Sequence, residues 1–439
     1  MKKIIFVSLM MMMSILYPQN QKLTLQESLV LGLENSKDLK ISHSKVIGSD
    51  AKVSEINSMF LPQLKFVANY TRLSDNVPPF EFTTPFLPVP VKISDPVLDN
   101  YNLKLSFQQP LFTGLRLLSS KKAANYNYSA TELEYSKDKN EAAFNIHTAF
   151  WNYYKNQQIK ELLANSLTQT EKHLKDTKNF LDNGLATQND YLRLQVQYSN
   201  TKLLLIEAEN NLDVARAVFN KSLGLPLEAP TEILAEDINV EVVTYNIEEL
   251  LTEAKSNRDE LESLEYKLKA TNENITAAQS TWFPSIYLTG NFYYNNPNVR
   301  VQPLIGEWND TWDAGVTLNW DIWNWGLTSS QTTQAEELAV QTRSLLEKTV
   351  DNIEVEVYQS YLNTVKSKEK VDVSRLGLEQ ASENYRITKE KYNEQLATST
   401  DLIDAEVSEL QAATNLKSAL VDYEIAKTRL EKSLGRRIY

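Results

Sequence analysis

Four stretches of the chain alternate between apolar and polar residues with a period of two, the pattern of a β-strand whose two faces meet different surroundings. They cover residues 63–73, 101–112, 285–294 and 311–323. In the second stretch, for example, Leu103 and Leu105 alternate with Asn102 and Lys104. Within each pair, a proline-containing segment separates the two stretches, and we expect it to form an exposed loop.

Aromatic residues gather near the strand ends of the second pair, as they do where outer-membrane sheets meet the lipid headgroups. The candidates for such an aromatic girdle are Trp312, Trp320, Trp323, Trp325, Tyr293 and Tyr294. This pattern favours a sheet with one face in lipid and a polar face lining a water-filled pore. A soluble, half-buried sheet is the alternative, because it produces the same alternation.

Four strands are too few to close a barrel, and an open edge in lipid would leave backbone N–H and C=O groups without partners. If the sheet lies in a membrane, other copies of the chain must therefore complete the wall. Three copies would supply 12 strands, enough to close around a wide lumen. The pattern thus predicts a homotrimer in contact with outer-membrane lipid.

Two very long helices are predicted next to the strand pairs. Residues 115–183 contain neither proline nor glycine, and residues 327–393 contain only Gly377. Both are rich in good helix formers, and about 65 helical residues would extend for about 100 Å. A helix of that length must run along a partner helix, as in a coiled coil. Return helices beginning near residues 188 and 399 complete two predicted hairpins, 115–222 and 327–434.

The chain contains an internal repeat. Leu185-Ala186-Thr187 recurs as Leu396-Ala397-Thr398, and Lys221-Ser222-Leu223-Gly224 recurs as Lys432-Ser433-Leu434-Gly435, in both cases 211 residues later. Each half therefore has the order helix, strand, loop, strand, long helix, turn and return helix. We assign the first repeat to residues 21–224, a linker region to 225–257 and the second repeat to 258–439.

The first residues have the features of a secretory signal peptide, which we assign to residues 1–20. Lys2 and Lys3 precede an apolar run over residues 4–16, which is too short to span a bilayer as a helix. A buried N-terminal helix is the alternative. No later stretch offers about 20 consecutive apolar residues. The net charge of −12 and the sequence pI of about 5.0 argue against nucleic acid as a partner.

Candidate catalytic chemistry is missing from the sequence. There is no cysteine, and His43, His147 and His173 stand at no metal-binding spacing, so we expect them to be solvent-facing helix residues. Neither a nucleophile elbow nor a phosphate-binding glycine loop occurs. We therefore predict no enzyme activity, no cofactor and no metal site.

The chain resembles the TolC-like outer-membrane efflux proteins over nearly its whole mature length. The similarity lies in residues 25–34, Phe60-Leu61-Pro62, Gly114, the two Leu-Ala-Thr turns and the two Ser-Leu-Gly ends. The resemblance implies a mixed α+β membrane protein, a trimer whose 12-stranded β-barrel continues into a long α-helical coiled-coil barrel in the periplasm. Residues 225–257 would form an equatorial band.

The resemblance also implies a function. Such a protein is the passive exit duct of a tripartite efflux pump or a type I secretion system, in the outer membrane of a Gram-negative bacterium. Its partners would be a periplasmic adaptor (membrane fusion protein) and an inner-membrane RND or ABC transporter. The competing hypothesis is a non-pore periplasmic coiled-coil structural or adaptor protein, and a secreted hydrolase is a third. Neither the transported substrate nor the transporter class follows from the sequence.

Residues of a periplasmic gate are implied by the same resemblance. Asp401 and Asp404 match two aspartate rings at the entrance, and both can face one lumen because they stand three residues apart on a helix. Tyr392 and Asp190 match members of the network that closes the family's channels, whereas the arginine of that network falls at Ala397. The alternative for Asp401 and Asp404 is a pair of solvated residues favoured by the helix dipole.

The turns at the far ends of the hairpins are the expected contacts with the adaptor. These residues are Gly184, Leu185, Gln395 and Leu396. A simpler interpretation, compatible with the first, is that Gly184 ends its helix at the C′ position.

Overall fold

The computed structural model describes residues 22–86, 88–236, 238–240 and 246–439. The predicted signal peptide, residues 1–20, lies outside this part of the chain. The chain divides into two compact units. We call His43–Glu134 with Glu260–Thr349 the strand unit, and Met1–Ser42, Tyr135–Asp259 and Val350–Tyr439 the helical unit.

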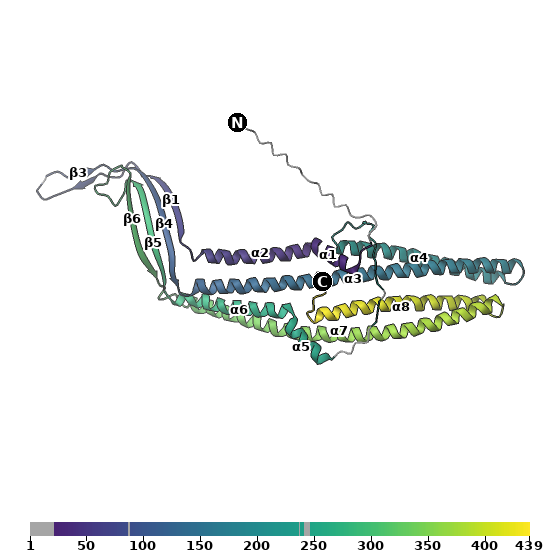
Figure 1. Cartoon of the computed structure of the whole chain (residues 1–439). Helices are drawn as coiled ribbons and strands as arrows, with labels where there is room; N and C mark the ends of the chain where they lie inside the picture. The colour runs from purple at the N-terminus through teal and green to yellow at the C-terminus, as the bar shows by residue number, and fades with distance from the viewer. Residues whose placement is uncertain (1–21, 87, 237, 241–245) are drawn as a thin grey trace, which may run out of the picture. The chain divides into compact units, whose positions relative to one another are not determined.

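The strand unit contains one antiparallel sheet of four strands (Figure 1). They are β1 (Gln63–Arg72), β4 (Asp99–Thr113), β5 (Ser285–Asn296) and β6 (Asn309–Asn319), in that spatial order. β1 and β6 each have one neighbour in the described chain, so both edges of the sheet are open. This arrangement brings the strand pair of the first repeat against that of the second through β4 and β5.

The sheet separates apolar from polar residues as the alternation predicts. Phe66, Leu105, Phe292 and Trp312 follow one another across the four strands on the apolar face. Their side chains are exposed, with Trp312 at 73% and Phe66 at 65%. Single exposed apolar residues are ordinary on a soluble protein, but a contiguous face of this kind marks an interaction with lipid or protein.

β6 is shorter than the predicted strand 311–323, because its pairing partner runs out. Ser285, the first residue of β5, pairs with Asn319, so no strand remains for the residues that follow. Trp320 lies beyond this end, and its indole N–H donates to the carbonyl of Trp282 at 3.2 Å. The prediction that Trp320 and Trp323 belong to the strand was therefore wrong.

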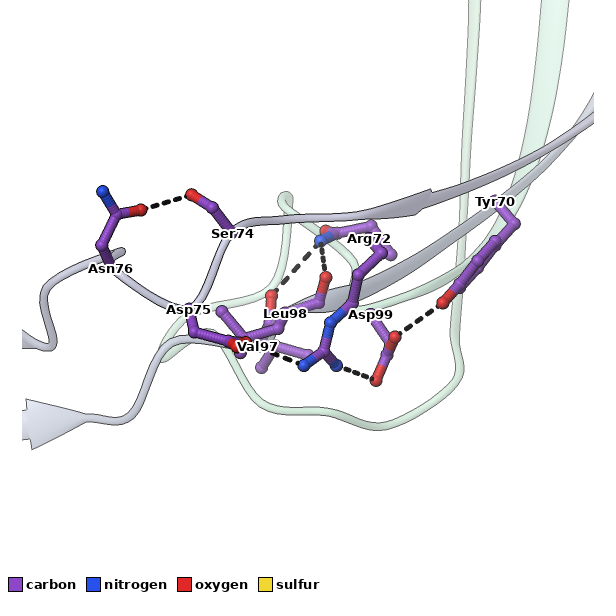
Figure 2. A network of polar contacts seen from close by, with 9 residues as sticks. Tyr70, Arg72, Ser74, Asp75, Asn76, Val97, Leu98 and Asp99 are labelled. Carbon is purple, nitrogen blue, oxygen red and sulfur yellow. Dashed lines mark hydrogen bonds and ion pairs between the residues drawn. The ribbon is translucent and has the colours of Figure 1, made fainter.

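The segment between β1 and β4 forms a second hairpin where only an exposed loop was expected. β2 (Phe80–Phe82) pairs with β3 (Val91–Ser94). At its base, Arg72 donates to Asp99 and to Asp75, both at 2.9 Å, and Tyr70 donates to Asp99 at 2.9 Å (Figure 2). The backbone of Leu73 also donates to Leu98. Strands of three and four residues are too short to be recognised from alternation.

Three further elements flank these strands. α2 (Lys37–Ser58) precedes β1, and α6 (Asp259–Gln279) with the short 3₁₀ helix η1 (Ser280–Trp282) precedes β5. Each repeat thus enters its first strand from a helix, as the order of predicted elements requires.

The helical unit is built on two hairpins of unequal arms (Figure 1). α3 (Arg116–Asp182) and α7 (Leu327–Asn393) have 67 residues each, and both also contribute to the strand unit. The return helices α4 (Gln188–Ser222) and α8 (Ser399–Ser433) have 35 residues each. All four boundaries of one hairpin lie 211 residues from those of the other, the offset of the sequence repeat.

The remaining helices of this unit are short. α1 (Leu25–Asn35) contacts the end of the first hairpin, where the Asn35 amide donates to the Leu223 carbonyl at 3.2 Å. α5 (Ile247–Asn257) contacts the end of the second, where Arg436 donates to Glu253 at 2.8 Å. Leu29 of α1 joins a buried cluster with Ile146 and Phe150 of α3 and Phe219 of α4. Leu23 also forms a parallel bridge with Ile233, which ties the start of the described chain to the linker region. Among the described residues, no helix is both long and apolar enough to cross a membrane.

Gly114 and Gly326 stand at equivalent turns from strand to long helix, with φ of 60° and 80°. A Cβ on Gly114 would overlap the carbonyl oxygen of Ser280, whereas a Cβ on Gly326 would meet nothing within 4 Å. Alanine in the left-handed region costs about 1–2 kcal/mol at either position.

We therefore expect Gly114→Ala to destabilise the strand unit clearly more than Gly326→Ala, because only Gly114 carries the additional overlap. The measurement is the urea midpoint of unfolding in detergent, followed by tryptophan fluorescence. Equal midpoints for the two variants would contradict the overlap at Gly114.

Candidate functional site

The candidate site lies at the turns of the two hairpins, which have the same backbone design. In the first, Leu185 N–H donates to Phe180 and Gly184 N–H to Leu181, at 2.8 and 2.9 Å. These are the two hydrogen bonds of a Schellman motif, which ends a helix with a residue of positive φ at C′. Gly184 is that residue, with φ of 75°.

The second turn repeats the motif with a different residue at C′. Leu396 N–H donates to Lys391 and Gln395 N–H to Tyr392, at 2.7 and 3.0 Å. Gln395 takes a φ of 58°, which glycine adopts at lower cost. The two leucines that follow, Leu185 and Leu396, are exposed at 57% and 78%. The tips therefore present apolar side chains to solvent.

Each return helix begins with a capping box. Thr187 and Thr398 are the N-cap residues, and their side chains accept from the backbone N–H of Asp190 and Asp401. In return, the Asp401 carboxylate accepts from the Thr398 hydroxyl at 2.7 Å and from its backbone N–H at 2.9 Å. These two hydrogen bonds hold the pKa of Asp401 below its ordinary value. Asp401 therefore caps its helix and stays ionised.

Asp190 has an additional partner that Asp401 lacks. The Ser399 hydroxyl of α8 donates to Asp190 Oδ1 at 2.6 Å, and the Thr187 hydroxyl donates to its other oxygen at 2.6 Å. The hydrogen bond from Ser399, followed by that from Thr187, lowers the pKa of Asp190. One carboxylate thus caps α4 and also holds the start of α8.

A second contact between the two return helices involves a residue that the sequence did not single out. Arg193 Nη1 of α4 donates to Thr400 Oγ1 of α8 at 2.6 Å. Both residues line a shallow groove with Asp404, and the other lining residues are Asn189, Leu192, Val196, Gln197 and Ile403. The family's gate arginine corresponds to Ala397 in this chain, so that cation is missing. Nothing in the sequence indicated that an arginine of α4 would contact α8 instead.

Tyr392 lies inside the hairpin bundle. Its hydroxyl shares a 2.7 Å hydrogen bond with Thr177 of α3, and both side chains are buried. Phe180 packs edge-on to its ring, and Leu402 and Ala405 belong to the same cluster. Burial raises the pKa of Tyr392. The hydroxyl that the resemblance assigns to the gate is therefore bound to Thr177 in this chain.

One to two turns back along α3, toward its N-terminus, a second polar cluster is buried. Glu406 of α8 accepts from Thr170 at 2.6 Å, and its other oxygen lies 3.4 Å from His173 Nδ1. Tyr385 of α7 approaches His173 Nε2 at 3.4 Å. His173 is only 5% exposed, so the expectation that it faces solvent was wrong. It is buried because α7 and α8 both pack on that face of α3.

The predicted gate residues thus fall into two groups. Asp190 and Tyr392 are engaged in contacts among α3, α4, α7 and α8. Asp401 and Asp404 are exposed on α8, whereas the residue that follows each of them, Leu402 and Ala405, is buried. No group of three or more His, Cys, Asp or Glu in the described ranges could hold a metal ion.

The aromatic candidates in the strand unit also divide. Tyr294 lies on the apolar face and stacks on Trp308 at 4.9 Å, and Trp308 in turn lies 5.6 Å from Tyr101. Tyr293 faces the opposite way, because it shares a face with Asn291 and Asp313. Trp312 is on the apolar face, and Trp323 packs edge-on to Trp325 at 5.8 Å beyond the end of β6. Tyr293 is therefore not a member of the apolar-face row.

A duplicated unit of two strands and a long helical hairpin, with an exposed apolar sheet face, defines the class of outer-membrane export channels. The family model described as "Outer membrane efflux protein" matches residues 29–225 and 250–436. The chain belongs to this family. It is an outer-membrane efflux channel protein of the Gram-negative type, and the family is not enzymatic.

Individual relatives agree with this assignment. The outer membrane protein TolC of Vibrio cholerae serotype O1 is 22% identical over 390 residues, covering 87% of this chain and 84% of that protein. Among solved structures, VceC of Vibrio cholerae has a TM-score of 0.78 at 16% identity, over 94% of this chain and 97% of that one. CmeC of Campylobacter jejuni has a TM-score of 0.79 at 16% identity, over 94% and 85%. The fold is shared although few residues are.

The buried pair Thr177 and Tyr392 gives a prediction about the strength of the hairpin contacts. Thr177→Val leaves the tyrosine hydroxyl buried without its partner, which costs about 1–3 kcal/mol. Adding Tyr392→Phe removes that unpaired hydroxyl, so the double variant should be more stable than Thr177→Val alone. The measurement is native-state hydrogen exchange of amides in α3 and α7 near the turn. If these amides exchange as fast in the double variant as in Thr177→Val, the hydrogen bond contributes nothing to the stability of the hairpin contacts.

Proposed function

We propose that three copies of the chain close their sheets into one 12-stranded barrel and so form a passive duct through the outer membrane. The observation that carries this proposal is the open sheet with an exposed apolar face. β1 and β6 present unpaired edges, and lipid offers no hydrogen bonds to such edges. A non-pore periplasmic protein would have no use for this face in water.

Strand direction is compatible with closure. Each neighbouring pair in the sheet is antiparallel, so β1 and β6 also run in opposite directions. The β6 edge of one copy can therefore pair in antiparallel fashion with the β1 edge of the next, and the alternation continues around the ring. Single-chain outer-membrane barrels follow the same antiparallel rule.

The helical hairpins would carry the duct into the periplasm. A chain of this class takes its cargo from a periplasmic adaptor and an inner-membrane transporter of the RND or ABC type. Apolar residues on the return helix α4 remain exposed in the single chain, including Leu192, Val196 and Leu203. Packing against neighbouring copies would cover them, as the coiled-coil barrel of a trimer requires.

The gate would be formed by Asp401 and Asp404 of each copy. Asp401 stands in the first turn of α8 and Asp404 in the second, and three copies would bring six carboxylates together. Such a ring attracts cations. The contacts of Asp190, Arg193 and Tyr392 described above would determine whether the constriction is open or closed. Arg193 would take the place of the arginine that is missing at Ala397.

This proposal predicts a trimer that conducts ions and is blocked by trivalent cations. Purified in detergent, the protein should have about three times the chain mass of 50.2 kDa, and in planar bilayers it should form channels. Asp401→Ala with Asp404→Ala should abolish the block. Because the pKa of Asp401 is lowered, its charge is present above that pKa and is lost only as the pH falls through it. The share of the block that depends on Asp401 should therefore persist on acidification until the pH falls below the ordinary range of an aspartate.

Asp182→Ala is the matched control, because Asp182 is exposed at the end of α3 and forms a local ion pair with Lys178 one turn away. It should leave the block unchanged. A stable monomer without current would refute the channel, whereas a conducting trimer whose block survives the double substitution would refute only the ring assignment.

The adaptor would bind at the turns that expose Leu185 and Leu396. Leu396→Ser removes an apolar contact without touching the Schellman hydrogen bonds, so it should weaken adaptor binding several-fold while conductance stays constant. Co-purification with the cognate adaptor provides the measurement, and Asp182→Ala provides the control, since it changes an exposed residue at the end of α3 and keeps both leucines. Equal adaptor recovery for all three proteins would place the docking surface elsewhere.

A further inference from the structure

Cross-strand pairing arranges the polar face of the sheet in rows. One row consists of Lys65, Ser106, Asn291 and Asp313. The next consists of Val67, Lys104, Tyr293 and Thr311, and the one beyond of Asn69, Asn102, Asn295 and Asn309. These rows contain two lysines against one aspartate, although the chain as a whole carries a net charge of −12.

Two cations of this face lie over the ring of Tyr293. The Lys104 ammonium lies 5.3 Å from the centroid of its ring, and the Arg300 guanidinium lies 4.3 Å from the same centroid. Arg300 belongs to the segment between β5 and β6, so it adds a third cation to the face. Both distances are within the range in which a ring quadrupole attracts a cation.

The one carboxylate in these rows is already neutralised. Asp313 accepts from Arg300 at 2.6 Å and from the Asn291 amide at 2.7 Å. Neither Lys65 nor Lys104 forms an ion pair within the described ranges of the chain. Two positive charges per chain are therefore left without a counter-charge on the polar face.

We infer that the polar face of the sheet is an anion-attracting band, in which Lys65 and Lys104 raise the local concentration of negatively charged solutes above that of positively charged ones. This inference rests on the proposed function, because the face must line a lumen for the charges to act on cargo. Three copies would bring six such lysines around one pore. Charges of one sign on low-dielectric walls concentrate counter-ions.

The chemistry of the band suggests its preferred cargo class. Organic anions that carry a carboxylate, sulfonate or phosphate group would be drawn to the lysines. In the adjoining row Asn295 is buried and accepts from the backbone of Leu103, whereas Asn69 and Asn102 keep accessible amides, which suit the polar, uncharged part of the same solute. Asp401 and Asp404 of the helical unit have the opposite sign, so the two units would select on different criteria.

Reversal potentials in planar bilayers under a potassium chloride gradient test the inference. The variant Lys65→Gln with Lys104→Gln keeps a polar side chain with an N–H donor at each position but removes both charges. We expect its ratio of chloride to potassium permeability to fall about threefold or more at low salt. The difference should shrink at 1 M salt, where the Debye length is only about 3 Å.

The matched control is Arg72→Gln. Arg72 stands on the same sheet but on the apolar face, where it pairs with Asp99 at the rim. Its loss should leave the permeability ratio unchanged. An unchanged ratio in the lysine variant, or an equal fall in the Arg72 variant, would overturn the inference while leaving the channel intact. Absence of current from the wild-type protein would instead overturn the proposed function.

A second measurement does not depend on conductance. The chain has no cysteine, so Asn102→Cys introduces a single thiol in the row next to Lys104. A negatively charged methanethiosulfonate should label it several-fold faster than a positively charged one, each relative to its rate with free cysteine. This preference should disappear when both lysines are glutamine. Equal relative rates with the lysines present would sink the idea.

Discussion

The constraint behind the whole structure is that a backbone in lipid must pair every N–H and C=O group. The sheet satisfies it along β4 and β5 and leaves it unsatisfied at β1 and β6. The same incompleteness recurs in the helical unit, where α4 exposes Leu192, Val196 and Leu203. Apolar burial contributes about 25 cal/mol per Å², so both units gain stability from a neighbour that covers these surfaces. In the proposed trimer, assembly would therefore be part of folding.

Much of the fold follows from local patterns, because strands and long helices are specified by periodicity and by the absence of breakers. The 211-residue repeat located both hairpins, and the observed boundaries of α3 and α7 keep that offset. Boundaries that depend on pairing were less predictable. β6 ends at Asn319 because its partner β5 begins at Ser285. The alternation continues through residues 320–322, but it does not show where the partner strand begins.

The site was predictable only as far as the turns. Capping residues and Gly184 reflect local backbone geometry, which a short stretch of sequence determines. Contacts between helices that are distant in sequence depend on helix rotation instead. For this reason the sequence did not identify the contact of Arg193 with Thr400. It also did not show that His173, whose sequence neighbours are polar, is buried beside Glu406. Tyr293 shows the same limit in the sheet, since an aromatic residue near a strand end can belong to either face.

The duplication explains how equivalent positions provide both a contact between the return helices and an exposed charge. Asp190 and Asp401 occupy equivalent capping boxes, but only Asp190 meets a serine from the other return helix. At the offset of 211 residues, Arg193 corresponds to Asp404, so the two copies of this position carry opposite charges. The first hairpin thus uses its polar groups to hold α8, and the second keeps its carboxylates exposed. A repeat with identical side chains could not divide these roles, because equivalent surfaces would compete for the same partners.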